Sequence, residues 1–199
     1  MNKKNTAPAR PVSGVPTKAK PKGEAFAQAR PMGGAYTQTV IEHFQKPHNY
    51  GKMEDPDGVG KVGNTVCGDV MWLYIRVGKT KGKEIIADVK FETFGCVAAI
   101  ATSSVITDMA KGKILADALA IDKQSIVKQL GGLPPIKLHC SVLAADALAE
   151  AIYDYMTKNK RAIPADLEEK HRRISVEKEE IEKKYKDWID IEEGIQKKC

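Results

Sequence analysis

The sequence predicts an α+β domain in which helices pack on one face of a small antiparallel sheet. Two neighbouring segments, 70–77 and 85–93, alternate between apolar and polar side chains, as strands with one wet face do. From residue 96 onward the apolar period lengthens to that of helices and keeps it to residue 158. Strands that come first and helices that follow are typical of this fold class.

The first ordered element is predicted to be a helix in YTQTVIEHFQKP. Tyr36, Val40, Ile41 and Phe44 share one helical face there, and Pro47 ends the helix. A glycine-rich approach, GVGKVGNTVCGDV, then leads to the first strand. The side chains expected to point into the core from the two strands are Met71, Leu73, Ile75 and Val77, and then Ile85, Ala87, Val89 and Phe91.

Four helices are predicted after the strands. The first runs from Cys96 to Gly112, and a short one spans 115–121. A third begins at Ser125 as its N-cap and ends at Gly131. The fourth, 141–158, is long and amphipathic. Its inner stripe is predicted to consist of Val142, Ala145, Leu148, Ile152 and Tyr155.

Both ends of the chain differ from the domain, which we expect at 36–160. Residues 1–35 hold five of the ten prolines and seven basic side chains against Glu24 alone, and we interpret them as a disordered basic arm. A mitochondrial presequence is the alternative, although such segments are Arg-rich and amphipathic.

Residues 161–199 are predicted to form a charged helical extension. One apolar residue per heptad is too few for a coiled coil, so we expect this helix to lie on the domain or on a partner, with Ser175 as a candidate N-cap. The recurring apolar residues are Leu167, Ile174, Ile181, Trp188 and Ile195, with Tyr185 and Ile191 beside them.

The net charge of +6 lies in the arm, because the other residues carry equal numbers of basic and acidic side chains. This distribution argues against nucleic-acid binding by the domain.

No apolar run approaches the roughly 18 residues of a membrane span, and no signal-peptide core is present, so we expect a soluble protein. Four cysteines without a secretory signal indicate a reducing compartment, either the cytoplasm or, as the alternative, the mitochondrial matrix.

Three of the four cysteines lie at boundaries between elements. Cys67 sits in a glycine-flanked turn before a strand, whereas Cys96 and Cys140 each end an extended run and open a helix. The free N–H groups and positive dipole end of a helix favour a thiolate over a thiol. Asp69 follows Cys67 and His139 precedes Cys140, so harder ligands accompany the thiols. The spacing leaves two readings open: a site for zinc, iron or an iron–sulfur cluster, or a set of buried thiols.

A catalytic cysteine is the third hypothesis. His139 could activate a thiol, but neighbouring side chains of a strand point to opposite faces, so His139 and Cys140 need not touch. The sequence has no G-x-S-x-G elbow, cysteine-protease signature or Walker A loop, and GVGKVG lacks the strand and helix that flank a dinucleotide-binding motif. His43 and His48 read as ordinary helix and turn residues.

The motifs VCGDV, FGCVAAIATSS and LPPIKLHCS, preceded by YTQTVIEHFQKPHNYG, together resemble the IscU/NifU N-terminal family of iron–sulfur cluster scaffold proteins. The resemblance covers about residues 36–160. It implies a three-stranded, IscU/SufE-like fold and a scaffold that is not an enzyme. On it a transient 2Fe–2S cluster would be built from iron and desulfurase-derived sulfur and passed to apo-proteins.

The resemblance also assigns residue roles. It places the ligands on Cys67, Cys96 and Cys140, with Asp69 or His139 as the exchangeable fourth group. Cys140 is the candidate persulfide acceptor. We expect Lys137, on the same predicted strand face as His139, to steer sulfur or anionic cluster charge.

The implied partners are several. The segment of Leu133, Pro134, Pro135, Ile136 and Lys137 resembles the one that a DnaK-type chaperone grips, with its J-domain co-chaperone; the simpler reading is a stiff, extended entry to the site. The other expected partners are a cysteine desulfurase, a ferredoxin or frataxin-like protein, the apo-protein recipients and a second copy in a homodimer.

The histidine before the last motif cysteine and the lack of a long insertion after Cys67 favour the Isc type. The alternative is a SufU-like, zinc-bound sulfur acceptor that stimulates a desulfurase. Val97 follows Cys96 where the family commonly has glycine, which we expect to stiffen the loop. The two extensions fall outside the family pattern, and Cys199 reads as an exposed free thiol.

Overall fold

The structure is a computed structural model that describes residues 35–64 and 67–196, and of the last helix the side chains up to 180 and that of Lys183. The arm predicted to be disordered at 1–35 lies outside the described residues except for Ala35, and so does Cys199, which is predicted to be an exposed free thiol. The predicted domain boundaries stay predictions. No helix of the described part is long and apolar enough to cross a membrane.

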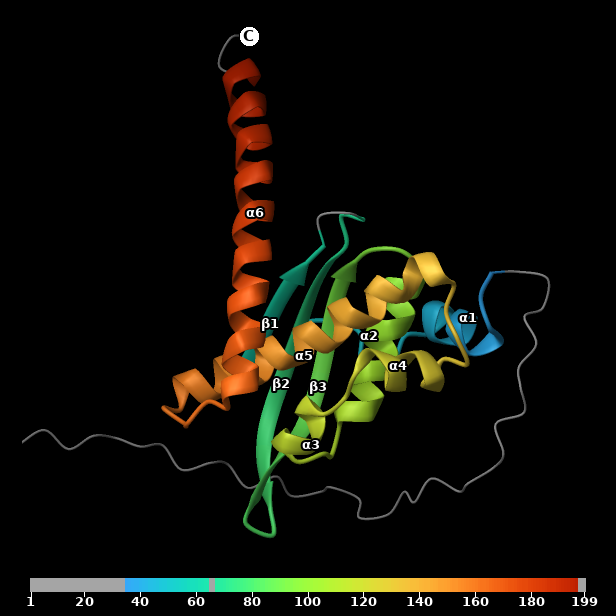
Figure 1. The fold of residues 1–199 in the computed structure, drawn as a ribbon, viewed down its shortest axis with the longest axis vertical. Coiled ribbons are helices and arrows are strands. Elements are labelled where there is room, and N and C mark those ends of the chain that lie inside the picture. Colours follow the sequence, from blue (N-terminus) through green and yellow to red (C-terminus); the bar gives the residue numbers. More distant parts are fainter. Residues whose placement is uncertain (1–34, 65–66, 197–199) are drawn as a thin grey trace, which may run out of the picture.

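The predicted α+β class is confirmed, with helices against one side of a three-stranded antiparallel sheet of order β1-β2-β3 (Figure 1). The strands are β1 (Gly58–Gly63), β2 (Val70–Thr80) and β3 (Lys83–Phe94). The helices are α1 (Gln38–Gln45), α2 (Val97–Ala110), α3 (Leu115–Leu119), α4 (Lys123–Gln129), the 3-10 turn η1 (Pro135–Lys137), α5 (Leu138–Lys158) and α6 (Ala165–Gln196).

The segment GVGKVG, to which the sequence analysis assigned no strand, forms β1. It is a strand because it pairs antiparallel with β2, from Gly58 opposite Ile75 to Gly63 opposite Val70. Helix α5 packs on it, and Gly58 and Gly60 let the two backbones approach. A Cβ on Gly60 would stand 2.0 Å from the carbonyl oxygen of Ala147, and one on Gly58 would stand 2.2 Å from that of Ala151. Glycine is required wherever another backbone comes this close.

The inner face of the sheet is largely as predicted. Met71, Leu73 and Ile75 are fully buried, and so are Val89 and Phe91. The predicted place of Ala87 in this row is wrong: it is half-buried. The cause is a bulge in the β2–β3 pairing, after which Val77 pairs with Ile86, so that Ile86 takes the buried place. On the opposite face Asp88, Lys90 and Glu92 are half-buried, and Tyr74 is buried.

Two predicted helix starts are also wrong. The N-cap of α4 is Asp122, and Ser125 is the third helical residue, whose hydroxyl completes a capping box with the Asp122 backbone. Helix α5 begins at Leu138, three residues earlier than predicted, so His139 and Cys140 belong to its first turn. No strand forms before it, because Pro135–Lys137 is a 3-10 turn.

Helix α5 is buried on a wider surface than the predicted stripe. Leu148, Ile152 and Tyr155 are buried as expected, whereas Val142 and Ala145 are only half-buried. The helix lies between the sheet on one side and α2, α4 and α6 on others, so small residues are buried all along it. These additional buried residues are Leu143, Ala144, Ala147, Ala149 and Ala151.

Helix α6 is continuous through Ser175, so the predicted N-cap there is wrong. Its first heptad residues, Leu167 and Ile174, are buried, and this part of α6 contacts α5 and β1. Beyond them the helix runs past the end of the domain (Figure 1). The side chains of the later heptad residues, from Ile181 on, lie outside those described.

Candidate metal centre

The three motif cysteines meet at one end of the sheet. Cys67 lies in the turn between β1 and β2, Cys96 follows β3, and Cys140 lies in the first turn of α5. Figure 1 shows these elements converging at the upper end of the domain. The antiparallel order brings the end of β1, the start of β2 and the end of β3 to this edge, and α2 and α5 both begin there.

Asn64 organises the turn that carries Cys67. Its side-chain oxygen accepts hydrogen bonds from the Cys67 backbone N–H at 3.1 Å and from the Cys67 thiol at 3.4 Å. Gly68 follows with a φ of +71°, a conformation that favours glycine. Asn64 is a site residue that was not predicted from the sequence, although an asparagine before a Gly-containing turn is a known turn signal.

Asp69 is the centre of the site. It is buried, and its Oδ2 lies 4.0 Å from the Cys96 sulfur and 3.8 Å from the Cys140 sulfur. The two sulfurs are 3.8 Å apart. One potential ligand atom from each of these three residues lies within 4.8 Å of the others. Two thiols and a carboxylate are therefore already within reach of one small ion or cluster.

A second set shares the same aspartate. Cys67, Asp69 and His139 also bring one ligand atom each within 4.8 Å of one another. Within the described residues, the His139 Nε2 atom is buried without a hydrogen-bond partner. A buried imidazole nitrogen without a partner is costly unless something binds it, so this atom fits a ligand role. All five predicted site residues thus lie in one cluster.

The expectation that His139 and Cys140 lie on a strand and point to opposite faces is wrong. Both are helical, so successive side chains diverge by about 100° rather than alternating across a strand. They nevertheless join different sets of ligands. For the same reason Lys137 and His139 do not share a strand face. Lys137 ends the 3-10 turn instead.

The protonation of the thiols differs from the expectation based on helix dipoles. Cys140 is fully buried, and burial, with the neighbouring Cys96 and Asp69, raises the pKa of its thiol. Burial likewise raises the pKa of Cys67. Desolvation outweighs the helix N-terminus at Cys140, and without a metal the thiol form is favoured there. The Cys96 sulfur in turn raises the pKa of the Lys137 ammonium, which places a cation beside the thiols.

Gly95 is a site residue that the sequence analysis missed. A Cβ there would lie 2.9 Å from Asp69 Oδ1 and 2.8 Å from the Ala99 methyl group. The glycine before Cys96 therefore lets the β3–α2 connection close over the carboxylate. Behind the thiols, Cys140 packs with Ala98 and Ala99 against Tyr36 and Leu133, which makes a tight apolar wall.

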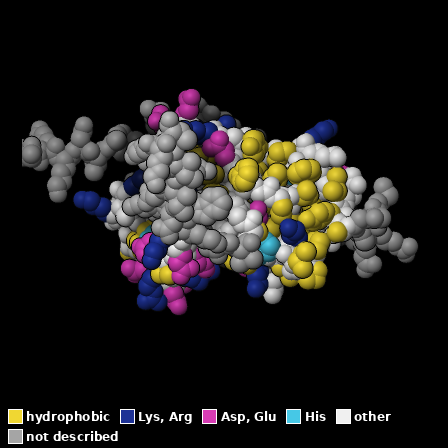
Figure 2. Space-filling model, turned by 90° about the horizontal axis from the view of Figure 1, so that it is seen from above, with side chains coloured by type: hydrophobic (Ala, Val, Ile, Leu, Met, Phe, Trp, Pro, Cys, Tyr) yellow, Lys and Arg dark blue, Asp and Glu magenta, His cyan; other side chains and the backbone are white. Residues whose placement is uncertain are grey.

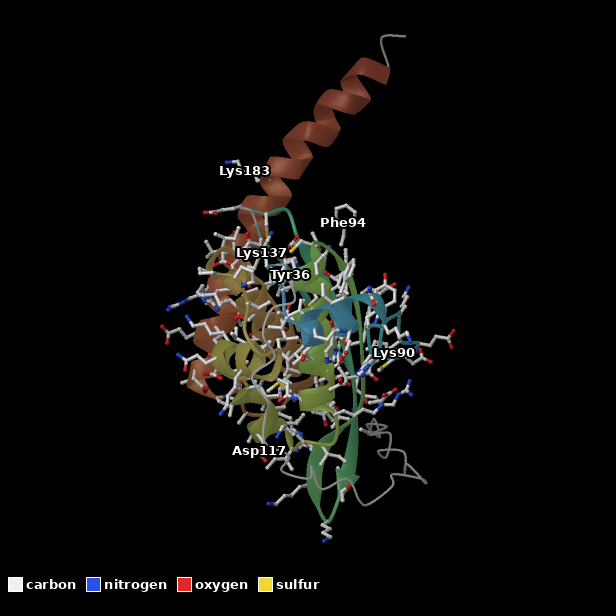
Figure 3. The ribbon with its side chains drawn as sticks, turned by 90° about the vertical axis from the view of Figure 1, so that its right-hand side faces the viewer. Tyr36, Lys90, Phe94, Asp117, Lys137 and Lys183 are labelled. Atoms are coloured by element: carbon white, nitrogen blue, oxygen red, sulfur yellow. The ribbon has the colours of Figure 1, made fainter. Side chains whose placement is uncertain are left out.

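Exposed apolar side chains lie at this end of the domain. Phe94 is 79% exposed and Ile136 is 77% exposed, and Leu138 is also exposed. Figure 2, which views this end, shows apolar side chains gathered over one side of it, and Figure 3 places Phe94, Tyr36 and Lys137 together at the end opposite Asp117. Exposed clusters of this kind commonly mark binding surfaces.

The predicted chaperone segment is only partly as expected. Pro135 and Ile136 are exposed, but Leu133, Pro134 and Lys137 are half-buried. The backbone is extended at Pro134 and then turns, with the Lys137 N–H bonded to the Pro134 carbonyl at 2.8 Å. The expectation of a continuously extended segment is therefore wrong.

Three thiols, a carboxylate and an imidazole at one end of the sheet of an α+β domain form a donor set that is typical of cysteine-ligated metal-binding proteins. Comparison with known families is more specific. Residues 35–162 match the model of the NifU-like N terminal domain, and the chain belongs to that family, as its motifs indicated.

Two curated relatives come from Archaeoglobus fulgidus and are described as iron-sulfur cluster assembly scaffold proteins, IscU 1 and IscU 2. Each is 51% identical to this chain over 155 residues, which cover 78% of this chain and 94% of the relative. Among solved structures, the N-terminal part of a nitrogen-fixing NifU-like protein from Brucella abortus is 22% identical with a TM-score of 0.47. That match covers 62% of this chain and 96% of that one.

Proposed function

We propose that this chain is a scaffold and carrier for the assembly of 2Fe–2S clusters, in which the protein binds and releases its cargo and is not an enzyme. The observation that carries the proposal is the position of Asp69, buried between two sets of ligands that include all three motif cysteines. Family membership and the scaffold role of the Archaeoglobus relatives support it.

The mixture of ligands suits a carrier. Cys67, Cys96 and Cys140 would hold iron as thiolates, and Asp69 or His139 would supply the fourth ligand. A carboxylate or imidazole binds iron less firmly than a fourth thiolate would, which favours release. The orphaned Nε2 of His139 and the carboxylate of Asp69 offer two exchangeable positions next to each other.

Sulfur would enter through Cys140. Once the Cys140 thiol has lost its proton to solvent, its thiolate would attack the outer sulfur of a desulfurase persulfide, form a new S–S bond, and release the desulfurase cysteine as a thiolate. Cys140 is fully buried beneath Leu133, so the 133–137 segment has to move before this step. Lys137 beside Cys96 would stabilise the anionic sulfur that arrives.

We assign the exposed apolar side chains near the metal centre, Phe94, Ile136 and Leu138, to contacts with partner proteins. Phe94 and Ile136 would face the cysteine desulfurase or the apo-protein recipients, and the segment 133–137 would face a DnaK-type chaperone with its J-domain co-chaperone. A ferredoxin or frataxin-like protein and a homodimer are the remaining proposed interactions. The three described free thiols require a reducing compartment, which we take to be the cytoplasm, with the mitochondrial matrix as the alternative.

The test is anaerobic reconstitution with iron, cysteine and a desulfurase, followed by visible absorption and by iron and sulfide analysis. Replacing Cys67, Cys96 or Cys140 with serine should abolish stable cluster formation, whereas Cys199→Ser, which changes a cysteine outside the motifs, should not. Cluster yields equal to wild type in all three motif variants would refute the site.

Metal analysis of the protein purified without oxygen separates this function from the SufU-like alternative. One zinc per chain that persists when excess ferrous iron is added would favour the zinc-bound sulfur acceptor. Its donor set would be the same cysteines with Asp69 or His139, since zinc accepts sulfur, nitrogen and oxygen ligands.

A further inference from the structure

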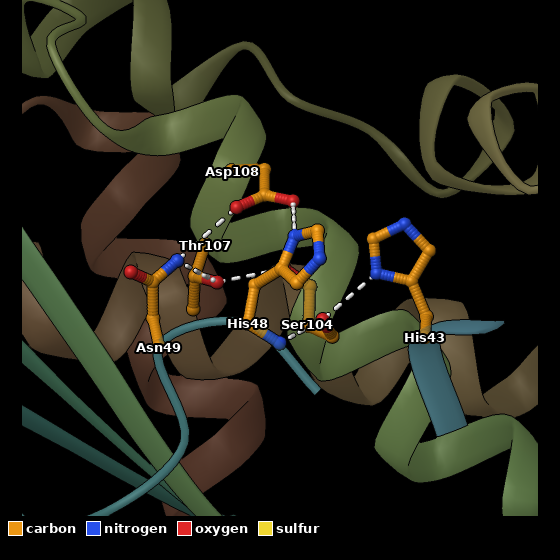
Figure 4. A network of polar contacts seen from close by, with 6 residues as sticks. All are labelled: His43, His48, Asn49, Ser104, Thr107 and Asp108. Carbon is orange, nitrogen blue, oxygen red and sulfur yellow. Dashed lines mark hydrogen bonds and ion pairs between the residues drawn. The ribbon is translucent and has the colours of Figure 1, made fainter. Parts of the chain in front are cut away.

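A second group of potential metal ligands lies on the side of the domain, away from the cysteines. His43 is in the last turn of α1, His48 is in the loop that follows, and Asp108 is near the end of α2 (Figure 4). One ligand atom from each lies within 4.8 Å of the others. Asp108 is twelve residues along α2 from Cys96, or about 18 Å at the rise of a helix. This group is therefore separate from the cysteine site.

Hydrogen bonds between α2 and the α1–loop segment position these three residues. The buried Ser104 hydroxyl oxygen accepts the His48 backbone N–H at 2.8 Å and lies 2.8 Å from His43 Nδ1. Asp108 is oriented by Asn49, whose side-chain N–H₂ donates to Oδ1 at 3.1 Å. Partners of this kind, which fix ligand orientation, are characteristic of metal sites.

The arrangement remains open to solution. The side chain of His48 is 57% exposed and that of Asp108 is 42% exposed, with His48 Nδ1 2.6 Å from Asp108 Oδ2. The two imidazole rings lie 4.8 Å apart between centroids and are tilted by 56°. An ion could therefore enter without disturbing the core, replacing the hydrogen bond between His48 Nδ1 and Asp108 Oδ2.

We propose that His43, His48 and Asp108 form a binding site for one divalent transition ion, with zinc as the natural occupant. Two imidazoles and one carboxylate are a donor set that zinc and its neighbours prefer, while calcium and magnesium favour oxygen alone. The bound ion would tie the loop after α1 to α2, the helix that begins at Cys96. No local sequence pattern indicates the site, because Asp108 lies 60 residues beyond His48.

The alternative is that these three residues bind no metal and that the His48–Asp108 hydrogen bond alone attaches the loop to α2. A metal titration distinguishes the two hypotheses, because only the first predicts an ion that is bound without thiolate ligands. Cobalt(II) is a suitable probe, because ions bound by cysteine thiolates show intense sulfur-to-metal charge-transfer bands and ions bound only by nitrogen and oxygen do not.

The experiment titrates the full chain with cobalt(II) under anaerobic conditions and measures both the bands and the bound metal. We expect a class of sites without the thiolate band, one ion per chain, that zinc displaces. His48→Gln and Asp108→Asn should each weaken this class by roughly tenfold or more and leave the thiolate band unchanged. His171→Gln is the matched control, since His171 also bonds to a carboxylate, Glu150 at 2.9 Å, but has no second imidazole beside it.

Thermal unfolding keeps the test valid if a variant folds less well. Zinc should raise the Tm of the wild type and of His171→Gln by more than that of His48→Gln. The proposal is overturned if all bound cobalt carries the thiolate band, or if His48→Gln binds the thiolate-free ion as tightly as the control. Neither outcome affects the scaffold proposal, which depends on the thiolate-bound class alone.

Discussion

Replacing Gly60 with alanine should test how closely the fold and the metal centre depend on one contact. The new Cβ would stand 2.0 Å from the Ala147 carbonyl oxygen and 2.8 Å from the Ala151 backbone nitrogen. Real Cβ atoms essentially never come closer than 3.0 Å, so α5 must move away from β1 by about 1 Å. The obstructing atoms are helix backbone, which cannot rotate aside as a side chain would.

The cost follows from that displacement. Overpacking a core costs about 1–3 kcal/mol, and a gap of about 1 Å forfeits up to half of the dispersion energy of the atoms that it separates. Because α5 contacts both β1 and β2, we expect the upper end, a loss of about 3 kcal/mol from the free energy of unfolding. A domain of this size has only about 5–15 kcal/mol in total.

Urea denaturation of the metal-free protein, followed by circular dichroism, measures this loss. Lys61→Ala is the control, because Lys61 is exposed on the same strand; its ammonium lies 5.7 Å from the centroid of the Trp72 ring, so its loss should cost no more than about 1 kcal/mol. The shift of α5 would also move His139 and Cys140 relative to Cys67, so thiolate-bound cobalt should be weaker in Gly60→Ala. Stability within about 0.5 kcal/mol of wild type would show that the β1–α5 contact is not as close as described.

Three further predictions concern other contacts. Thr37→Val should cost about 1–2 kcal/mol in urea denaturation, because the Thr37 hydroxyl caps α1 at the Val40 N–H and donates to the Leu130 carbonyl; an unchanged midpoint would contradict this. Leu167→Ala should cost about 2–5 kcal/mol if α6 unfolds together with the domain, whereas Val176→Ala, at an exposed position, should cost little; equal costs would refute the docking of α6. Burial and the hydrogen bond to Glu92 raise the pKa of Tyr74 to about 12, so its protonated form stabilises the fold fully below pH 10 and this contribution is lost as the pH rises from 10 to 12. The stability difference between wild type and Tyr74→Phe should narrow over that range, and a constant difference would contradict the assignment.

Local patterns in the sequence predicted much of the fold. The alternation in 70–77 and 85–93 predicted the β2–β3 hairpin, because a sheet with one wet face imposes a period of two. The positions of Cys67 and Cys96 at element boundaries were also predicted, the first from the neighbouring glycines and the second from the change of the apolar period from that of a strand to that of a helix. The motifs then identified the family, since several of them occur in a fixed order.

Other features depended on contacts between distant segments. A bulge moved Ile86 rather than Ala87 into the core, and the partner strand decides where a bulge forms. The first turn of α5 reached back to Leu138 because Pro135 can open a 3-10 turn, and the thiol of Cys140 was then buried against Ala98 and Ala99. Burial therefore raised its pKa where the helix dipole alone would have lowered it.

The sequence by itself determined the fold class and the family, and it pointed to the five residues that the fold brings together at the candidate metal centre, because hydrophobic period, turn residues and motif order are local properties of the chain. Only the tertiary structure decided that Asp69 stands between two sets of ligands, that Gly60 lies against α5, and that His43 and His48 meet Asp108. Those relations join residues tens of positions apart. They exist only once the helices pack on the sheet, and no local pattern encodes their distances.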